Sequence, residues 1–245
     1  VADTAGNAMT STTVPSNNNI ADSSAIVIDT TAPTLSSSSP ADDATAVAVG
    51  SNIVLNFSEA VDVGSGDIVI YASDNSVIET IAVGSSQVTG TGTTQITINP
   101  SSDLASSTQY YVQIEATGFD DAAGNSYAGI TDTTSLSFTT ADIVAPTVSS
   151  FSSTTSNGSY NVGDTINITA TTSESIQSGN TITVTLDTGD TVELTAASAG
   201  TTLTGTYTVG AGDTSSDLTV SSFSIGIVAD TAGNAMTSTT VPSNN

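Results

Sequence analysis

The chain has 245 residues, of which 24 are Asp or Glu, and it contains no Lys, Arg, His or Cys, so its formal net charge is -24. Nucleic acids and anionic membrane surfaces are bound through basic patches, which this composition cannot supply, and both are excluded as partners. Catalysis by His, Cys, Lys or Arg is excluded too, so we expect no enzymatic activity and no small-molecule substrate.

The remaining composition is that of a folded chain rather than of an acidic tail. Hydrophobic residues make up 37% of it, and the acidic residues are spread singly between β-branched runs. The length suits two domains of ordinary size. No apolar run approaches the roughly 20 residues of a membrane span, so we expect no direct membrane insertion. Because the chain starts inside a motif, we expect an internal piece of a longer polypeptide.

An exact repeat joins the two ends of the sequence. The first residues, VADTAGNAMTSTTVPSNN (Val1–Asn18), recur letter for letter as Val228–Asn245, which sets a period of 227 residues. An identical match of this length indicates recently duplicated units and predicts a tandem array. The segment that follows the first copy, SSAIVID (Ser23–Asp29), is therefore expected to be the last strand of a preceding module.

A weaker repeat lies within this period and divides the chain into modules. Each copy has an Asp-x-x-Ala-Pro linker, a strand that ends in Ser-Glu, several alternating strands and an Asp-x-Ala-Gly-Asn turn. The copies run through DTTAP (Asp29–Pro33), FSEAV (Phe57–Val61), DAAGN (Asp121–Asn125) and FTTAD (Phe138–Asp142), then through DIVAP (Asp142–Pro146), TSESI (Thr172–Ile176) and DTAGN (Asp230–Asn234). The repeat predicts a remnant of a preceding module at 1–28, a complete module at 29–142, and a second module at 143–245 that lacks its last strand.

Alternation of apolar and polar residues with period two predicts the strands. In chain order they are Asn52–Ser58, Asp67–Ala72, Thr94–Asn99, Tyr110–Ala116, Thr165–Thr171, Thr181–Asp187 and Thr191–Ala196. Turn signals such as Asp74-Asn75, Gly90-Thr91-Gly92 and Asp187-Thr188-Gly189-Asp190 separate them, and no segment has a helical period. One buried and one wet face per strand predicts two antiparallel sheets packed as a sandwich.

At this point the residues resemble a known family. SPADDATAVAVGSNIVLNFSEAV (Ser39–Val61), DDAAGN (Asp120–Asn125) and LSFTT (Leu136–Thr140) are similar to the SbsA-type bacterial Ig-like domains found in tandem in S-layer proteins, RTX-type adhesins and biofilm proteins. The segment Val144–Ile176 resembles a related domain. The resemblance implies tandem immunoglobulin-like β-sandwiches arranged end to end, an extracellular location on the bacterial surface, and the role of a stalk or spacer.

Six carboxylates recur at matching positions of the two modules: Asp29, Glu59, Asp121, Asp142, Glu174 and Asp230. Calcium takes about six to eight oxygen ligands, and carboxylates that lack a basic partner must stay solvated, take up protons or bind a metal. We expect Ca²⁺ at the module junctions, with Asp62, Asp120 and Asn125 as further ligands. The resemblance implies the same, because adhesin Ig-like extenders commonly hold calcium in their linkers. The alternative is that Asp-x-Ala-Gly-Asn is only a tight turn.

Two structural functions fit these features. One is a calcium-stiffened stalk or extender of a cell-surface adhesin, whose partners are neighbouring modules of the same array. The other is a module of a self-assembling filament, sheath or surface layer, in which the open edge of the second module accepts Ser23–Asp29 of an identical chain. Against the second, a donor chain also brings Val1–Asn18, which duplicates Val228–Asn245 of the acceptor.

Overall fold

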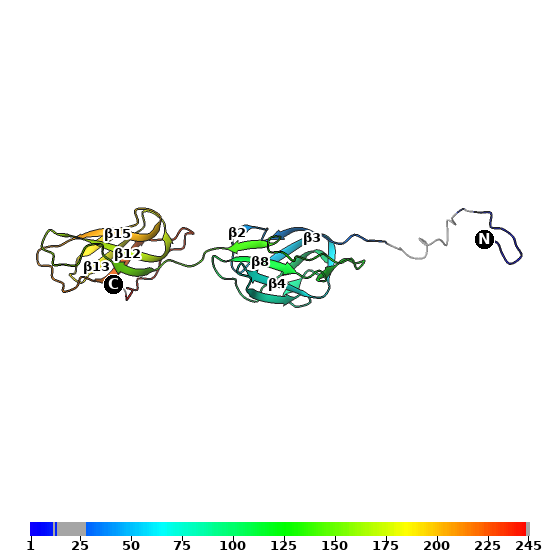
Figure 1. The fold of residues 1–245 in the computed structure, drawn as a ribbon, viewed down its shortest axis with the longest axis horizontal. Helices are drawn as coiled ribbons and strands as arrows, with labels where there is room; N and C mark the ends of the chain where they lie inside the picture. The colour runs from blue at the N-terminus through cyan, green and yellow to red at the C-terminus, as the bar shows by residue number, and fades with distance from the viewer. Residues whose placement is uncertain (12, 14–27, 244–245) are drawn as a thin grey trace. The chain divides into compact units, whose positions relative to one another are not determined.

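The structure is a computed structural model that describes residues 1–11, 13 and 28–243 of the chain. Every regular element among them is a β-strand, and the all-β prediction is confirmed. The strands form two bodies, which we call the first sandwich (β1–β10, blue to green in Figure 1) and the second sandwich (β11–β16, green to red). Among the described residues, no helix is long and apolar enough to cross a membrane.

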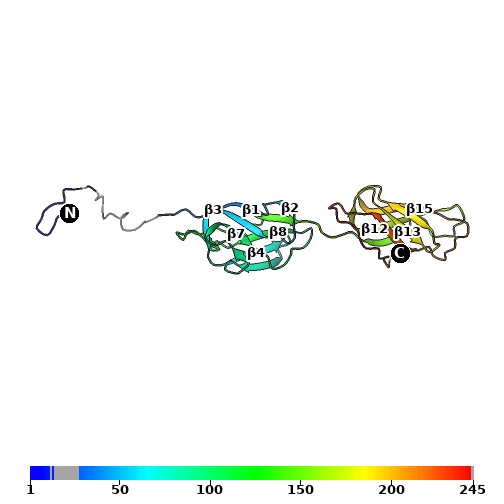
Figure 2. The same ribbon diagram turned by 180° about the vertical axis from the view of Figure 1, so that it is seen from behind.

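The first sandwich consists of two sheets. Its strands are β1 (Leu35–Ser39), β2 (Ala44–Val47), β3 (Ile53–Val63), β4 (Asp67–Ala72), β5 (Val77–Ala82), β6 (Val88–Thr89), β7 (Thr93–Ile98), β8 (Gln109–Ile114), β9 (Phe119–Asp120) and β10 (Ser137–Thr140). One sheet has the order β1-β3-β7-β6, with β9 added to β3, and the other has the order β2-β10-β8-β4-β5. Figure 2 shows β1, β3 and β7 from behind.

In strands such as β3, the alternation in the sequence places one face in the core. In β3, Ile53, Leu55 and Phe57 are buried, while the residues between them are only half-buried. Phe57 packs against Phe119, with ring centroids 5.4 Å apart, and against Tyr127 at 5.2 Å. Successive side chains of a strand point to opposite faces, so this burial pattern is the expected result of period-two alternation.

Strand β10 lies inside its sheet, between β2 and β8. It follows Leu136, which is 1% exposed, and carries Phe138, which is 2% exposed. Burying an apolar side chain of this size contributes roughly 1.5–3 kcal/mol. The last strand of the first sandwich therefore supplies a substantial part of its core.

The second sandwich is one sheet that folds back on itself. Its strands are β11 (Val148–Ser152), β12 (Thr165–Ile176), β13 (Thr181–Leu186), β14 (Thr191–Thr195), β15 (Gly200–Thr208) and β16 (Val220–Ile227), in the order β11-β12-β15-β14-β13-β16. The first and last strands of this order pack against each other: the rings of Phe151 on β11 and Phe223 on β16 have centroids 5.7 Å apart. Between β14 and β15 the pairing is Thr195 with Thr204.

The strands with clear alternation were predicted, and several Ser-rich strands were not. Strands β1 (LSSSS) and β16 (VSSFSIGI) show little alternation of apolar and polar residues. Strands β3 and β12 extend beyond the predicted ends at Ser58 and Thr171, as far as Val63 and Ile176. Of the strand expected at Ser23–Asp29, residues 23–27 lie outside the described residues, and Ile28 and Asp29 belong to no strand.

Candidate metal centre

The six repeated carboxylates come together as two clusters of three. The first cluster is Asp29, Glu59 and Asp121, and the second is Asp142, Glu174 and Asp230. In each cluster, one oxygen from every residue lies within 4.8 Å of the others. Each cluster thus combines a linker residue, a strand residue and a loop residue that are far apart in the sequence.

A β-bulge positions the glutamate of each cluster. Along β3, pairing with β7 is interrupted between Asn56 and Val61, and along β12, pairing with β15 is interrupted between Thr171 and Ile176. Bulges bend a strand and redirect its side chains. Glu59 and Glu174 lie within β3 and β12, so the prediction that each strand ends at Ser-Glu was wrong, because both strands continue beyond the interruption.

The Asp-x-Ala-Gly-Asn segment closes on its own aspartate. Asp121 Oδ1 accepts the backbone N–H of Ala123 and of Asn125, both at 2.8 Å, and its Oδ2 accepts the Asn125 side-chain amide at 2.8 Å. Gly124 takes a left-handed conformation, with φ of +88°. The tight turn expected as the alternative to a metal site is present, and its aspartate is also a member of the carboxylate cluster.

The same loop forms three times. Asp230 accepts the N–H of Asn234 at 2.8 Å and its side-chain amide at 2.7 Å, and Asp3 accepts the equivalent bonds from Asn7 at 2.9 and 2.8 Å. The Asp3 copy is exposed on all its residues, and no cluster of carboxylates adjoins it among the described residues. The loop therefore holds its shape through its own hydrogen bonds, without help from a sandwich.

Two further contacts, which the sequence did not reveal, anchor the linker that precedes each sandwich. The side-chain amide of Asn125 donates to the backbone carbonyl of Asp29 at 3.3 Å, and that of Asn234 donates to the carbonyl of Asp142 at 3.2 Å. On the other side of each Ala-Pro pair, Ser58 Oγ accepts the N–H of Thr34 and Ser173 Oγ accepts that of Thr147, both at 3.0 Å. The only signal for these contacts in the sequence is that the residues recur in the matching motifs of both modules.

Asp62 and Asp120 do not join the clusters. They face each other across the β3–β9 pair, where Asp62 is the register partner of Asp120. Asp62 Oδ1 accepts the Thr91 hydroxyl at 3.1 Å. Of the further ligands expected from the sequence, Asn125 is thus the one that contacts cluster residues.

Burial and charge act differently on the three carboxylates of a cluster. The side-chain hydrogen bond from Asn125 lowers the pKa of Asp121, which is 5% exposed. Burial favours the neutral form of Asp230, but the hydrogen bonds from Asn234 and Gly233 outweigh it and lower its pKa. Burial, followed by the charges of Asp142 and Asp230, raises the pKa of Glu174. The second cluster therefore concentrates negative charge around Glu174.

The raised pKa of Glu174 predicts a pH dependence in the absence of metal. A carboxyl whose pKa is raised on folding destabilises the folded state when it is ionised, and this penalty vanishes below the unfolded value. In EDTA we expect Glu174→Gln to be more stable than the parent chain, by a margin that grows as the pH rises from 4.5 towards 7. Thermal denaturation across this range measures the margin, with Glu193→Gln on an exposed face of β14 as the control. A margin that stays constant with pH would contradict the assignment.

The comparison with family models agrees with an Ig-like fold for the first sandwich. A family model described as bacterial Ig-like domain matches residues 29–140. No curated protein sequence matches the chain. Among solved structures, the crystal structure of the S-layer protein rSbsC is similar over 85% of this chain, with 13% sequence identity and a TM-score of 0.31. The match covers 31% of that protein, so this chain spans less than a third of its length.

Proposed function

Because residues 29–140 of this chain belong to the bacterial Ig-like domain family, we propose that the chain is a structural repeat region of a bacterial cell-surface adhesin, in which calcium stiffens a stalk. Domains of this family are structural in general, which agrees with a non-enzymatic function. An extracellular location, and an adhesive part carried elsewhere in the polypeptide, belong to the same proposal.

The observation that carries the proposal is the composition of the two carboxylate clusters. Each cluster takes one carboxylate from the linker, one from the bulged strand and one from the closed loop: Asp29, Glu59 and Asp121, then Asp142, Glu174 and Asp230. A cation that bridges the three fixes the linker against the sandwich that follows it. The linker already contains a proline with a restricted φ, so a bound cation removes much of its remaining freedom.

The chemistry of the ligands favours calcium. The candidate ligands of both clusters are carboxylate oxygens, and the chain contains no His or Cys for a softer metal. Calcium accepts a large and irregular set of oxygens, whereas magnesium requires near-ideal octahedral geometry and keeps several waters. No lysine or arginine exists to neutralise the clusters, so a cation from solution is the remaining source of positive charge beside them.

Calcium titration calorimetry tests the proposal. We expect two equivalents of calcium per chain, and one equivalent for Glu59→Gln and for Glu174→Gln. Glu193 is an exposed glutamate outside both clusters, so Glu193→Gln is expected to retain two equivalents. Absence of binding by the parent chain, or equal loss in all three variants, would overturn the proposal.

A further inference from the structure

The last strand of the first sandwich lies beside a strand from its beginning. Strand β10 runs parallel to β2, with Phe138 opposite Ala44 and Thr140 opposite Val47. Just after β10, the Ala141 N–H donates to the Val47 carbonyl at 2.7 Å. Two segments from opposite ends of the domain sequence are therefore joined side by side.

Side chains join the starts of the same two strands. Ser137, the first residue of β10, is 4% exposed. Its N–H donates to Asp42 Oδ1 at 2.9 Å, and its hydroxyl lies 3.1 Å from Asp42 Oδ1 and 3.0 Å from Asp43 Oδ1. Asp42 and Asp43 immediately precede β2. The parallel pair is thus closed by hydrogen bonds at both of its ends.

The other edge of β10 is held by the loop that precedes β8. The Thr140 N–H donates to the Thr108 carbonyl at 3.0 Å, and the Thr140 hydroxyl donates to the Ala105 carbonyl at 2.6 Å. The same hydroxyl accepts the Thr108 N–H at 3.0 Å, and Thr140 is 3% exposed. Strand β10 therefore cannot slide along β2 without breaking these bonds as well.

The pairing of β2 with β10 includes an unusual backbone conformation. The register between the strands shifts between Phe138 and Thr140. Ala46, in the part of β2 that lies opposite this shift, has a φ of +54°. This left-handed conformation is unfavourable for alanine, and residues in it persist where the surrounding contacts fix them. The hydrogen bonds at the two ends of β2 supply such contacts.

The direction of the two strands determines how the pair responds to tension. When the chain is pulled from both sides of the domain, the segment before β2 is drawn backwards along β2 and the segment after β10 is drawn forwards along β10. Parallel strands then slide past each other in opposite directions, so all the bonds between them bear the load together. Release of β1 alone leaves this pair intact.

The β4–β5 hairpin shows the opposite arrangement. Its strands are antiparallel and consecutive in the chain, so a force on their free ends opens the bonds between them one after another. Bonds that must break together resist a larger force than bonds that break in sequence. The position of a hydrogen bond in the fold, and not only its strength, therefore decides whether it resists tension.

We propose that β2, β10 and the contacts of Asp42 with Ser137 form a shear clamp, which keeps the first sandwich folded under tension along the chain. Rupture of the clamp frees the strand that places Phe138, 2% exposed, in the core. Forced unfolding is governed by the rate of unfolding, so the bonds of this pair determine the lifetime under load. The inference goes beyond the calcium proposal, because none of these residues belongs to a carboxylate cluster.

Constant-force spectroscopy of the full chain tests the clamp. The chain contains no cysteine, so Thr31→Cys and Ile143→Cys, both at exposed positions, provide the only attachment points. The load then passes through the first sandwich and not through the second. We expect one main step on the order of 300 Å, the length of the released chain. EDTA in the buffer keeps the result separate from calcium binding.

Asp42→Ala is expected to shorten the lifetime under force by about tenfold, because it removes two hydrogen bonds that must break in the rate-limiting step. Asp74→Ala is the matched control. Asp74 Oδ1 accepts the Ser76 N–H at 2.9 Å and the Ser76 hydroxyl at 2.6 Å, but at the tip of the β4–β5 hairpin. Its bonds are still intact when the clamp breaks, so the lifetime is expected to stay within about twofold of the parent value.

Ser137→Ala is a milder second variant of the clamp. It removes the hydroxyl but keeps the N–H bond to Asp42, and we expect the lifetime to fall by about threefold. Ile81→Val lowers the free energy of unfolding through the core beside β5 without touching the clamp, and is expected to leave the lifetime within about twofold. Urea unfolding of the same variants measures their equilibrium stabilities.

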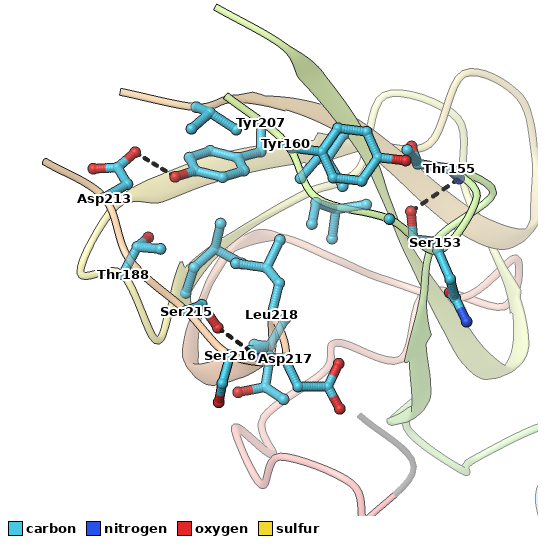
Figure 3. Close-up of a pocket in the computed structure, with 18 of the residues that line it drawn as sticks. Ser153, Thr155, Tyr160, Thr188, Tyr207, Asp213, Ser215, Ser216, Asp217 and Leu218 are labelled. Atoms are coloured by element: carbon cyan, nitrogen blue, oxygen red, sulfur yellow. Dashed lines mark hydrogen bonds between the residues drawn. The ribbon is translucent and has the colours of Figure 1, made fainter. Parts of the chain in front are cut away.

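A further control confirms the path of the load. Asp213 accepts the Tyr207 hydroxyl beside a pocket in the second sandwich (Figure 3), so Asp213→Ala is expected to leave the lifetime unchanged. If Asp42→Ala and Ser137→Ala keep the parent lifetime, the proposal is overturned. It is equally overturned if Asp74→Ala, Ile81→Val or Asp213→Ala shortens the lifetime as much as Asp42→Ala does.

Discussion

Replacing Asp230 with alanine is expected to destabilise the second sandwich by about 2–3 kcal/mol, whereas Asp3→Ala leaves its stability unchanged. Asp230 is 1% exposed, and its carboxylate accepts the N–H groups of Gly233 and Asn234 and the Asn234 side-chain amide, at 2.6–2.8 Å. Without the carboxylate, the half-buried Asn234 loses the acceptor of its backbone N–H and of its side-chain amide, and the N–H of Gly233 loses its acceptor too. When metal is absent, removing the Asp230 carboxylate also removes its charge repulsion with Glu174, and this offsets part of the lost stability.

Asp3 is a matched control provided by the chain itself. It sits in the same 18-residue repeated sequence and accepts equivalent bonds from Asn7, but its loop is exposed and belongs to neither sandwich. Urea unfolding in EDTA, with separate transitions for the two sandwiches, measures both variants. If Asp3→Ala and Asp230→Ala lowered the free energy of unfolding of the second sandwich equally, the packed position of the Asp230 loop would not be the cause of the destabilisation.

Excess calcium is expected to raise the melting temperatures of both sandwiches relative to EDTA. At about 100 times the dissociation constant, a ligand that binds only the folded state stabilises it by roughly 2.7 kcal/mol. For a domain of about 100 residues, each kcal/mol raises the melting temperature by roughly 4–8 °C, so we expect a rise of about 10–20 °C. Differential scanning calorimetry resolves the two transitions.

The glutamate variants assign each part of the calcium effect to one cluster. Glu59→Gln is expected to abolish the calcium-dependent rise of the first sandwich alone, and Glu174→Gln that of the second alone. Magnesium at the same concentration controls for general screening of charge. Identical melting curves in EDTA and in calcium would rule out a stabilising role for the metal.

Much of the fold and of the candidate site was predictable because the sequence repeats. Alternation identified strands such as β13, in which every second residue is buried, and β3 and β4, in which this holds for Ile53–Phe57 and for Ile68 and Ile70. The repeated motifs selected the six carboxylates, although Asp142 and Glu174 are remote in sequence from Asp230. A repeat reveals residues that cluster in space, because modules with the same fold place matching residues at matching positions even when the intervening segments differ.

The rest depends on tertiary pairing that a linear pattern does not encode. Strand β1 is four serines after a leucine, and it becomes a strand because β3 offers it a hydrogen-bonding edge. The bulges that bring Glu59 and Glu174 to the linkers interrupt pairing with β7 and β15, but neither β3 nor β12 contains a glycine that would mark them. The bond from Asn125 to the Asp29 carbonyl joins a side chain to backbone, and backbone groups carry no sequence signal.

The loop that occurs both free and packed also gives the chain two unequal targets for oxidants. Its only methionines are Met9 and Met236, which occupy the same position of the repeat and differ in exposure, at 69% and 4%. Peroxide converts an accessible thioether to the polar sulfoxide, whereas a buried one reacts only after the surrounding fold opens. Met9 therefore reports whether another molecule covers the first residues of the chain, and Met236 reports whether the second sandwich has opened.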